Sequence, residues 1–268
     1  MLNRLAGNIG KKTLSGMADM SHASRLINET IYWLFVGPLK KKGFRWASAV
    51  NQMVLIGYEA VPIISLISLA VGIIMALQAA YQLRRFGALI YVADLVGISI
   101  TRELGPLMSA IVLAGRSGSA FAAEIGSMKV AEEVDALKAM GLNPVKFLVV
   151  PKILGIVVML PGLILIADFM GIAGGFLVAV GSLDLNFERY FNQTVNALVL
   201  SDVLTGLIKG LVFALVIGFV GCHEGFSVDG GAEGVGLRTT RSVVTGIFLV
   251  ILADCFFTVL FYLFSQGV

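Results

Sequence analysis

Charged residues are scarce in this sequence. Lys, Arg, Asp and Glu make up 14% of its 268 residues, whereas an ordinary soluble domain has roughly 25%. This shortage excludes a disordered chain and almost any soluble enzyme, because neither can do without a charged, water-facing surface. Two cysteines exclude a disulfide scaffold. The net charge is only +3 and no basic block is present, so nucleic-acid binding is not indicated.

Motifs for catalysis or cofactor binding are also missing. Cys222 and Cys255 lie in apolar stretches without CxxC spacing or a histidine at ligand spacing, so we predict no metal site. Residues 7–13 resemble a phosphate-binding loop but lack the G-x-x-x-x-G-K-[ST] spacing. Residues 1–30 hold no apolar segment of the kind found in a secretion signal. We expect no catalytic residue and no cofactor on this chain.

Long apolar runs dominate the remaining sequence, which is 57% hydrophobic and contains 31 glycines. A membrane-spanning helix needs about 20 mostly apolar residues. Five stretches qualify, at about 61–83, 95–120, 147–180, 203–221 and 243–264. Glycine pairs four residues apart mark close helix packing; they are Gly171/Gly175, Gly206/Gly210 and Gly221/Gly225. We predict an all-α integral membrane protein in which residues 1–268 form one transmembrane domain.

The N-terminal region has a different pattern. Residues 1–23 are predicted as a tail. In segment 24–50 the apolar run is too short to cross, and Trp33 and Trp46 flank the lysines at 40–42, which is typical of a helix in the membrane interface. Lys and Arg concentrate in the N-terminal region, at 122–152 and at 222–241. We therefore expect a cytoplasmic N-terminus and, after five spans, a C-terminus on the outside.

Ionisable residues inside the spans form the first candidate site, because charge in the hydrocarbon region is costly. They are Arg102, Glu103, Arg116, Asp168, Lys209 and Asp254. Three of them, Arg102, Glu103 and Lys209, lie at similar depth from the outer side. We predict a hydrated outward cavity that holds a polar headgroup. The alternative is that Arg102–Glu103 and Lys209–Asp254 are structural ion pairs.

Residues 124–141, between the second and third spans, form the second candidate site. Val130, Val134 and Leu137 recur at helical spacing, and the pattern ends at Gly141. We predict a short amphipathic helix, with Ser127 as a possible N-cap. Such a helix either docks into a cytoplasmic partner or rests on the membrane.

Two other functions stay open on these residues. The sequence Gly-Arg-Ser-Gly at 115–118 resembles the serine motif of rhomboid intramembrane proteases, and His223 is the histidine predicted on the same side as Ser117. Arg116 beside that serine fits poorly, and the glycines are more simply packing residues. A stand-alone secondary transporter is the other alternative, although five spans do not divide into two equal inverted repeats.

Several ungapped blocks resemble a known family. They read Arg-Glu-Leu-Gly-Pro at 102–106, Ala-Gly-Arg-Ser-Gly-Ser-Ala at 114–120, Ala-Glu-Ile-Gly-Ser-Met at 123–128, Glu-Glu-Val-Asp-Ala-Leu at 132–137, Met-Gly-Leu-Asn-Pro at 140–144 and Gly-Gly-Ala-Glu-Gly-Val-Gly at 230–236. From about residue 45 to its end, the chain resembles the MlaE-type permease subunit of MCE-associated (Mla-type) phospholipid ABC transporters.

This resemblance implies an interfacial helix, five spans and a homodimeric permease in a Gram-negative inner membrane, with a periplasmic C-terminus. The implied partners are a cytoplasmic ATPase dimer that binds ATP and Mg²⁺, a periplasmic MCE-domain hexamer and, in some systems, a STAS-domain protein. The implied cargo is phospholipid, moved between inner and outer membranes in support of outer-membrane lipid asymmetry.

The resemblance also implies roles for particular residues. Segment 124–141 becomes the coupling helix that docks into the ATPase, with Glu124, Lys129, Glu132, Glu133, Asp135, Lys138 and Gly141 as its coupling residues. A cleft between spans 1, 2 and 5 becomes the lipid pathway, lined by Gln78, Tyr81, Arg102, Glu103, Lys209 and Asp254.

Overall fold

The computed structural model describes residues 21–34, 46–183 and 185–265, and the regular secondary structure in these segments is helical. Among these described residues, five helical segments are long and apolar enough to cross a membrane; they are Trp46–Phe86, Leu89–Val130, Val145–Ser182, Leu200–Phe226 and Gly231–Phe264. Each contains one of the five predicted spans. The prediction of an all-α integral membrane protein is therefore confirmed.

Several spans are built from more than one helical element. In chain order the elements are α2 (Trp46–Leu83), η1 (Arg84–Phe86), η2 (Leu89–Tyr91), α3 (Val92–Ser99), η3 (Ile100–Leu104), α4 (Gly105–Leu113), η4 (Ala114–Gly118), α5 (Ser119–Val130), α6 (Glu133–Ala139), η5 (Val145–Val149), α7 (Val150–Ser182), α8 (Phe187–Ala197), α9 (Leu200–Phe226) and α10 (Gly231–Ser265). The second span runs from η2 to α5, and the third joins η5 to α7.

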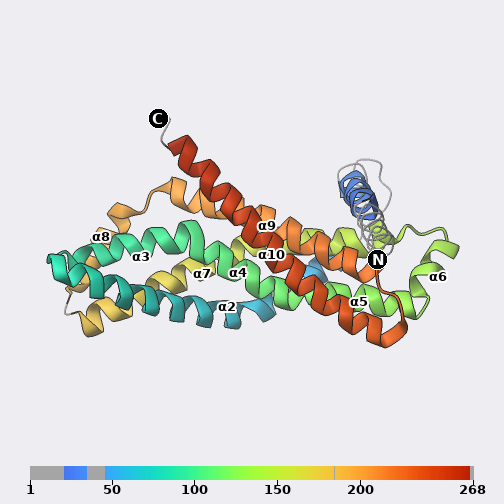
Figure 1. Ribbon diagram of the computed structural model, residues 1–268, viewed down its shortest axis with the longest axis horizontal. Helices are drawn as coiled ribbons and strands as arrows, with labels where there is room; N and C mark the ends of the chain where they lie inside the picture. The colour runs from blue at the N-terminus through green and yellow to red at the C-terminus, as the bar shows by residue number, and fades with distance from the viewer. Residues whose placement is uncertain (1–20, 35–45, 184, 266–268) are drawn as a thin grey trace, which may run out of the picture.

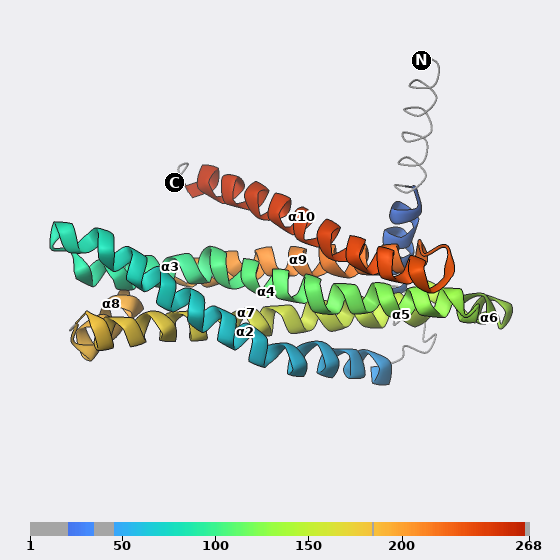
Figure 2. The ribbon, with the colours of Figure 1, turned by 60° about the horizontal axis from the view of Figure 1, so that its bottom comes forward.

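The spans form an elongated bundle with two distinct ends (Figure 1). One end, here called the α6 end, holds α6, the last turns of α5 and α9 and the start of α10. The other, the α8 end, holds α8, η1 and the start of α9. α10 packs along α5 and α9 near the α6 end, and its C-terminal half leans away from the other spans (Figures 1 and 2).

Residues 21–34 form a helix that crosses the bundle axis near the α6 end (Figure 2). Leu26 anchors it in the main core, and the Lys146 ammonium lies 5.0 Å from the centre of the Trp33 ring. This helix occupies the start of the predicted interfacial segment 24–50, and residues 35–45 lie outside the described residues. Residues 46–50 instead begin α2, where Ala49 is fully buried.

Two prolines coincide with widened turns inside the spans. Pro106 and Pro151 have no N–H, so each leaves the carbonyl four residues earlier without its usual helical partner. The preceding turns, η3 and η5, are π-helical; the Gly105 N–H donates to the carbonyl of Ile100, and that of Val150 to the carbonyl of Val145. π-helical turns are frequent at functional sites, and η3 carries Arg102 and Glu103.

Glycines bring the spans into backbone contact, as the spaced pairs predicted. A methyl group added to Gly72 on α2 would lie 1.9 Å from the carbonyl oxygen of Gly171 on α7. One added to Gly206 on α9 would lie 2.2 Å from the carbonyl oxygen of Thr101 in η3. Only glycine fits at these crossings, so α9 is held tightly against the turn that bears Arg102 and Glu103.

The predicted helix over 124–141 is divided in the structure. Residues 124–130 continue the second span as α5, so Ser127 is inside a helix and is not an N-cap. A break follows at Glu132, whose φ of 59° is in the left-handed region. The short α6 then ends at Gly141, with φ 72°, where the Leu142 N–H donates to the Leu137 carbonyl. Hydrophobic periodicity continued across this break and concealed it.

Candidate functional site

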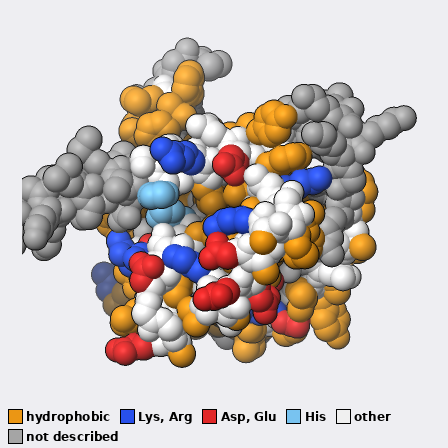
Figure 3. Space-filling model, turned by 90° about the vertical axis from the view of Figure 1, so that its right-hand side faces the viewer, with side chains coloured by type: hydrophobic (Ala, Val, Ile, Leu, Met, Phe, Trp, Pro, Cys, Tyr) orange, Lys and Arg blue, Asp and Glu red, His pale blue; other side chains and the backbone are white. Residues whose placement is uncertain are grey.

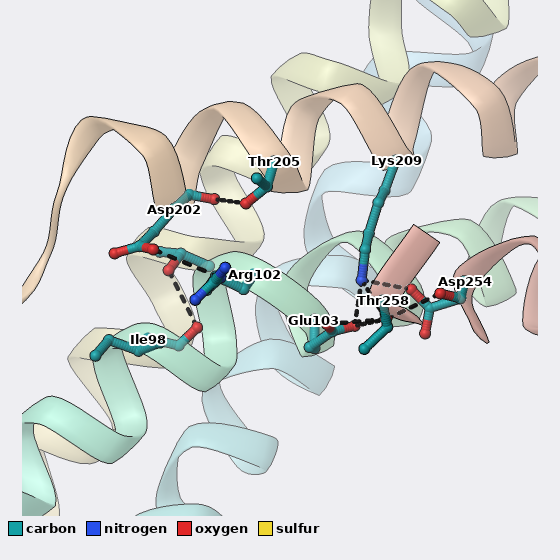
Figure 4. Close-up of polar contacts among 9 residues, drawn as sticks. Ile98, Arg102, Glu103, Asp202, Thr205, Lys209, Asp254 and Thr258 are labelled. Atoms are coloured by element: carbon teal, nitrogen blue, oxygen red, sulfur yellow. Dashed lines mark hydrogen bonds and ion pairs between the residues drawn. The ribbon is translucent and has the colours of Figure 1, made fainter. Parts of the chain in front are cut away.

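Three of the intramembrane charged residues, each on a different span, meet at Lys209 (Figure 4). Its ammonium lies 2.5 Å from Oε2 of Glu103 in η3 and 3.0 Å from Oδ1 of Asp254 on α10. The ammonium also donates to the Thr258 hydroxyl at 2.8 Å, and that hydroxyl donates to the Asp254 carbonyl. Lys209 is 1% exposed, so its charge is tolerated because these oxygens replace water.

Arg102 lies beside this cluster and pairs with a different residue. Its Nε lies 3.5 Å from Oδ1 of Asp202, at the start of α9. The other carboxylate oxygen of Asp202 accepts from the Val199 N–H, so Asp202 also caps α9. Of the two predicted structural pairs, Lys209–Asp254 is present. The Arg102–Glu103 pair is not, because consecutive residues of a helix point in different directions.

A cavity of about 230 Å³ opens at this cluster. It is lined by Arg102, Glu103, Thr205, Lys209, Thr258, Phe261 and Tyr262. One wall is therefore charged and the other, from the leaning half of α10, is aromatic. A cavity with these two walls suits an amphiphilic ligand, whose polar group and apolar chain need different surroundings.

The two remaining lipid-pathway candidates lie elsewhere. Gln78 and Tyr81 are exposed near the C-terminal end of α2, and neither lines the cavity around Lys209. The Tyr81 hydroxyl accepts a hydrogen bond of 3.0 Å from Arg85. The structure therefore brings together four of the six residues assigned to the pathway.

Two other intramembrane charges are also separate from the cluster. Arg116 forms an ion pair with Glu59 of α2 and donates to the Leu55 carbonyl. Asp168 is buried in α7, with Oδ1 against the backbone of Gly105. The Arg116 contacts tie the second span to α2 and give that residue a structural role, whereas Oδ1 of Asp168 has no hydrogen-bond partner among the described residues.

The predicted coupling residues divide into two groups at the α6 end. Glu124 and Lys129, both on α5, are held by contacts within the chain. Glu124 pairs with the buried Lys152 of α7, and Lys129 donates to the Phe226 carbonyl at 2.8 Å and lies 3.4 Å from Asp229. These contacts fix the end of the second span to α7 and α9.

The second group projects from α6 and its flanking turns. Val134 and Leu137 are buried against Leu148 of η5, so the apolar face of α6 is already covered. Glu132, Glu133, Asp135, Lys138 and Gly141 are exposed, together with the hydrophobic side chains of Met140 and Leu142. Lys138, which donates to Asp135 at 2.7 Å, lowers the pKa of that carboxyl. This tip presents ionised carboxylates and two apolar side chains to a partner.

The structure gives no support to a Ser117–His223 dyad. Ser117 is buried and lines a cavity with Arg116 and Glu59. His223 lines a different cavity at the α6 end, with His22. A serine nucleophile needs its base within hydrogen-bond reach, and the two side chains face separate cavities.

Comparison with known proteins identifies the family of this chain. The sequence matches the family described as Permease MlaE over residues 49–260. The chain belongs to the MlaE permease family. That match includes nearly all of the five spans, together with α6 and the residues that surround Lys209.

Relatives of this MlaE-family chain are named as ABC transporter permeases. It is 35% identical to a probable ABC transporter permease protein of Rickettsia bellii, over 98% of this chain and 99% of the relative. It is 37% identical to a probable ABC transporter permease protein of Synechocystis, over 82% of each chain. It is 30% identical to the chloroplastic protein TRIGALACTOSYLDIACYLGLYCEROL 1 of Arabidopsis thaliana, over 85% of this chain and 64% of that one. Family and fold together make this chain a multi-pass membrane permease, the transport subunit of an ABC transporter that works with an ATPase partner.

Sequence reasoning missed several charged contacts of this MlaE-family chain. Glu224, buried on α9, lies 3.0 Å from Arg238 and 3.4 Å from Arg241 of α10. Asp202 and Thr258 belong to the Lys209 region. Two of these could have been found from sequence: Thr258 is one helical turn from Asp254, and Glu224 lies just beyond a span that was predicted too short.

Proposed function

We propose that this permease moves phospholipids between the inner and outer membranes of a Gram-negative bacterium. In this proposal two copies pair in the inner membrane, with the N-terminus in the cytoplasm and the C-terminus in the periplasm. A cytoplasmic ATPase dimer binds ATP and Mg²⁺, with a STAS-domain protein bound to it in some systems. A periplasmic MCE-domain hexamer exchanges lipid with the permease.

The cavity around Lys209 is the observation that carries this proposal. Its charged wall, formed by Arg102, Glu103 and Lys209, can contact a zwitterionic or anionic headgroup. Its aromatic wall, from Phe261 and Tyr262, can contact acyl chains. A charged cavity among apolar spans has little use for an apolar cargo and is costly to maintain without function. The name of the chloroplastic relative contains that of a galactolipid, which also favours a lipid cargo.

The exposed face of α10 supports pairing of two copies. Val244, Phe248, Ile251, Phe256 and Val259 are among its large exposed side chains, and the helix leans away from its own bundle (Figure 2). A second copy packed on this face would enclose the adjoining cavity from the open side. Closure of the ATPase dimer would then act through α6 and narrow the space between the two copies.

Reconstitution tests the proposal directly. The complex is purified from its native membrane and placed in proteoliposomes that contain fluorescent phospholipid. We expect an ATPase and an MCE-domain protein to co-purify and lipid transfer to require ATP. Transfer without ATP by the lone chain would favour a secondary transporter. Peptide cleavage that is lost in Ser117→Ala, with lipid transfer absent, would favour the protease. Either result would overturn the proposal.

A further inference from the structure

A second large cavity lies at the α6 end, far along the bundle from Lys209. It has a volume of about 580 Å³ and lies between the helix at 21–34, the turns around α6 and the end of α9. Its charged side chains are mainly basic, with Arg25, Lys129, Lys138 and Arg238 against Glu29 and Asp229. Two histidines, His22 and His223, also line the cavity. Figure 3 views the molecule from this end and shows basic, acidic and histidine side chains gathered on one face. The excess of basic groups favours an anionic ligand.

The basic side chains of this cavity differ in whether they form ion pairs within the chain. Lys129 lies near Asp229, Lys138 donates to Asp135, and Arg238 pairs with Glu224. Arg25 is exposed and has no ion-pair partner among the described residues. Its guanidinium is therefore the group most available to an incoming anion, and its planar fork suits a phosphate.

An apolar groove adjoins this basic cavity. It measures about 370 Å³ and is lined mainly by aliphatic and aromatic side chains of the helix at 21–34, α9 and α10, including Ala23, Ile27, Leu215 and Phe219. Leu26 and His223 line both the groove and the basic cavity, so the two are continuous. A single molecule with a charged head and an apolar tail could occupy both.

The length of the groove matches one leaflet of a membrane. Along α9 it extends from Val212 to His223, which at 1.5 Å per residue is roughly 16 Å. Half of a hydrocarbon core about 30 Å thick is a similar distance. The helix at 21–34 crosses the bundle axis here, as expected of a helix lying at the membrane surface (Figure 2). The basic cavity is then at headgroup level and the groove at acyl-chain level.

We propose that this continuous cavity and groove bind one anionic phospholipid of the leaflet at the α6 end. Its phosphate contacts Arg25 and the neighbouring basic groups, and one acyl chain lies in the groove along α9, against Leu215 and Phe219. The site is separate from the cavity around Lys209. The bound lipid bridges the helix at 21–34 to α9 and α10, so it holds that helix against the bundle.

Native mass spectrometry of the purified full-length protein, with any subunits that stay bound, tests this site. The probes are phosphatidylglycerol, phosphatidylethanolamine and glycerol 3-phosphate. Reversing the charge of a basic residue near a membrane surface replaces attraction to an anionic headgroup with repulsion. Arg25→Glu should therefore weaken phosphatidylglycerol binding roughly tenfold or more. Arg25→Lys keeps the positive charge but loses the planar fork, so it should weaken phosphatidylglycerol binding much less than Arg25→Glu does.

Two further variants separate this site from general effects of charge. Arg189→Glu makes the same change at an exposed position on α8, at the opposite end, and should leave phosphatidylglycerol binding unchanged. Ala23→Trp fills the groove and should weaken phosphatidylglycerol binding without changing the response to glycerol 3-phosphate.

Equal binding of phosphatidylglycerol by wild type and Arg25→Glu would overturn the proposal, as would equal loss in Arg25→Glu and Arg189→Glu. Strong competition by glycerol 3-phosphate, with no effect of Ala23→Trp, would reveal a site for a soluble anion instead. The readout is lipid binding and requires no transport. Failure of the proposed transport function would therefore leave this result interpretable.

Discussion

The Lys209 ammonium on α9 lies 2.5 Å from Oε2 of Glu103, a residue of the π-helical turn η3 in the second span. Asp254 of α10 lies on the same ammonium at 3.0 Å. One buried cation therefore joins three spans at the edge of a cavity. These contacts could serve structure alone or structure and headgroup binding together, and the two cases can be separated by mutation.

Lys209→Met should destabilise the protein. It leaves two carboxylates without their cation, and breaking a buried ion pair costs roughly 3–5 kcal/mol. We expect a lower unfolding temperature in detergent and loss of lipid transfer. The triple variant Glu103→Gln, Lys209→Met, Asp254→Asn removes all three charges and should recover most of the unfolding temperature.

Lipid transfer by the triple variant decides the role of the cluster. If these charges contact headgroups, transfer stays low although stability returns. Recovery of both properties would show that the cluster is purely structural, and the lipid pathway would have to be assigned elsewhere.

Reversing charge on α6 should separate the permease from its ATPase. Glu133 and Asp135 are exposed, and their apolar neighbours Val134 and Leu137 pack within the chain. Glu133→Lys with Asp135→Lys should therefore abolish ATPase co-purification without affecting membrane insertion. Glu188→Lys, at an exposed site on α8, is the control and should co-purify normally. Normal co-purification of the ATPase with the α6 variant would show that α6 is not the helix that docks into the ATPase.

Substituting alanine for glycine at two positions separates the effect of close helix packing from that of helix propensity. In Gly72→Ala the new methyl group meets the Gly171 carbonyl oxygen at 1.9 Å, so α2 and α7 must separate. Overpacking of this kind costs about 1–3 kcal/mol. Gly162→Ala, on α7, meets nothing within 4 Å and should be neutral or slightly stabilising, because alanine favours the helix. Thermal unfolding in detergent measures both, and equal effects would contradict the close crossing.

Tyr190 makes stability depend on pH at the α8 end. Burial, with a smaller contribution from Asp94, raises its pKa from 10 to about 12. The folded state thus favours the neutral phenol, and this contribution is complete below pH 10 and is lost as pH rises toward 12. Denaturant titrations at pH 8 and 11 should show a larger loss of stability in wild type than in Tyr190→Phe. An equal loss in both would mean that Tyr190 is not desolvated.

The contrast between Arg102 and Lys209 shows how far sequence reasoning reaches. Both residues were assigned to the candidate site because a charge in the hydrocarbon region is energetically costly. The Lys209–Asp254 pair could be predicted because both residues were among the ionisable residues inside the spans. The pairing of Arg102 with Asp202 did not, because Asp202 lies at the edge of a span where charge is ordinary. Gln78 and Tyr81 were assigned to the pathway as lining of the cleft between spans 1, 2 and 5, and both lie outside the cavity around Lys209.

The sequence by itself determined the fold class and the positions of the five spans. A span is a continuous run of apolar residues long enough to cross the hydrocarbon core, so it can be recognised without knowledge of its neighbours. The sequence also identified the charged residues that lie inside these apolar spans. Only the tertiary structure decided which of those charges meet, since close glycine contacts such as Gly206 against Thr101 set the rotation and depth of each span. The break at Glu132 was decided there too, because α6 turns back to bury Val134 and Leu137 against Leu148. Periodicity within one segment carries no information about the partner that covers it.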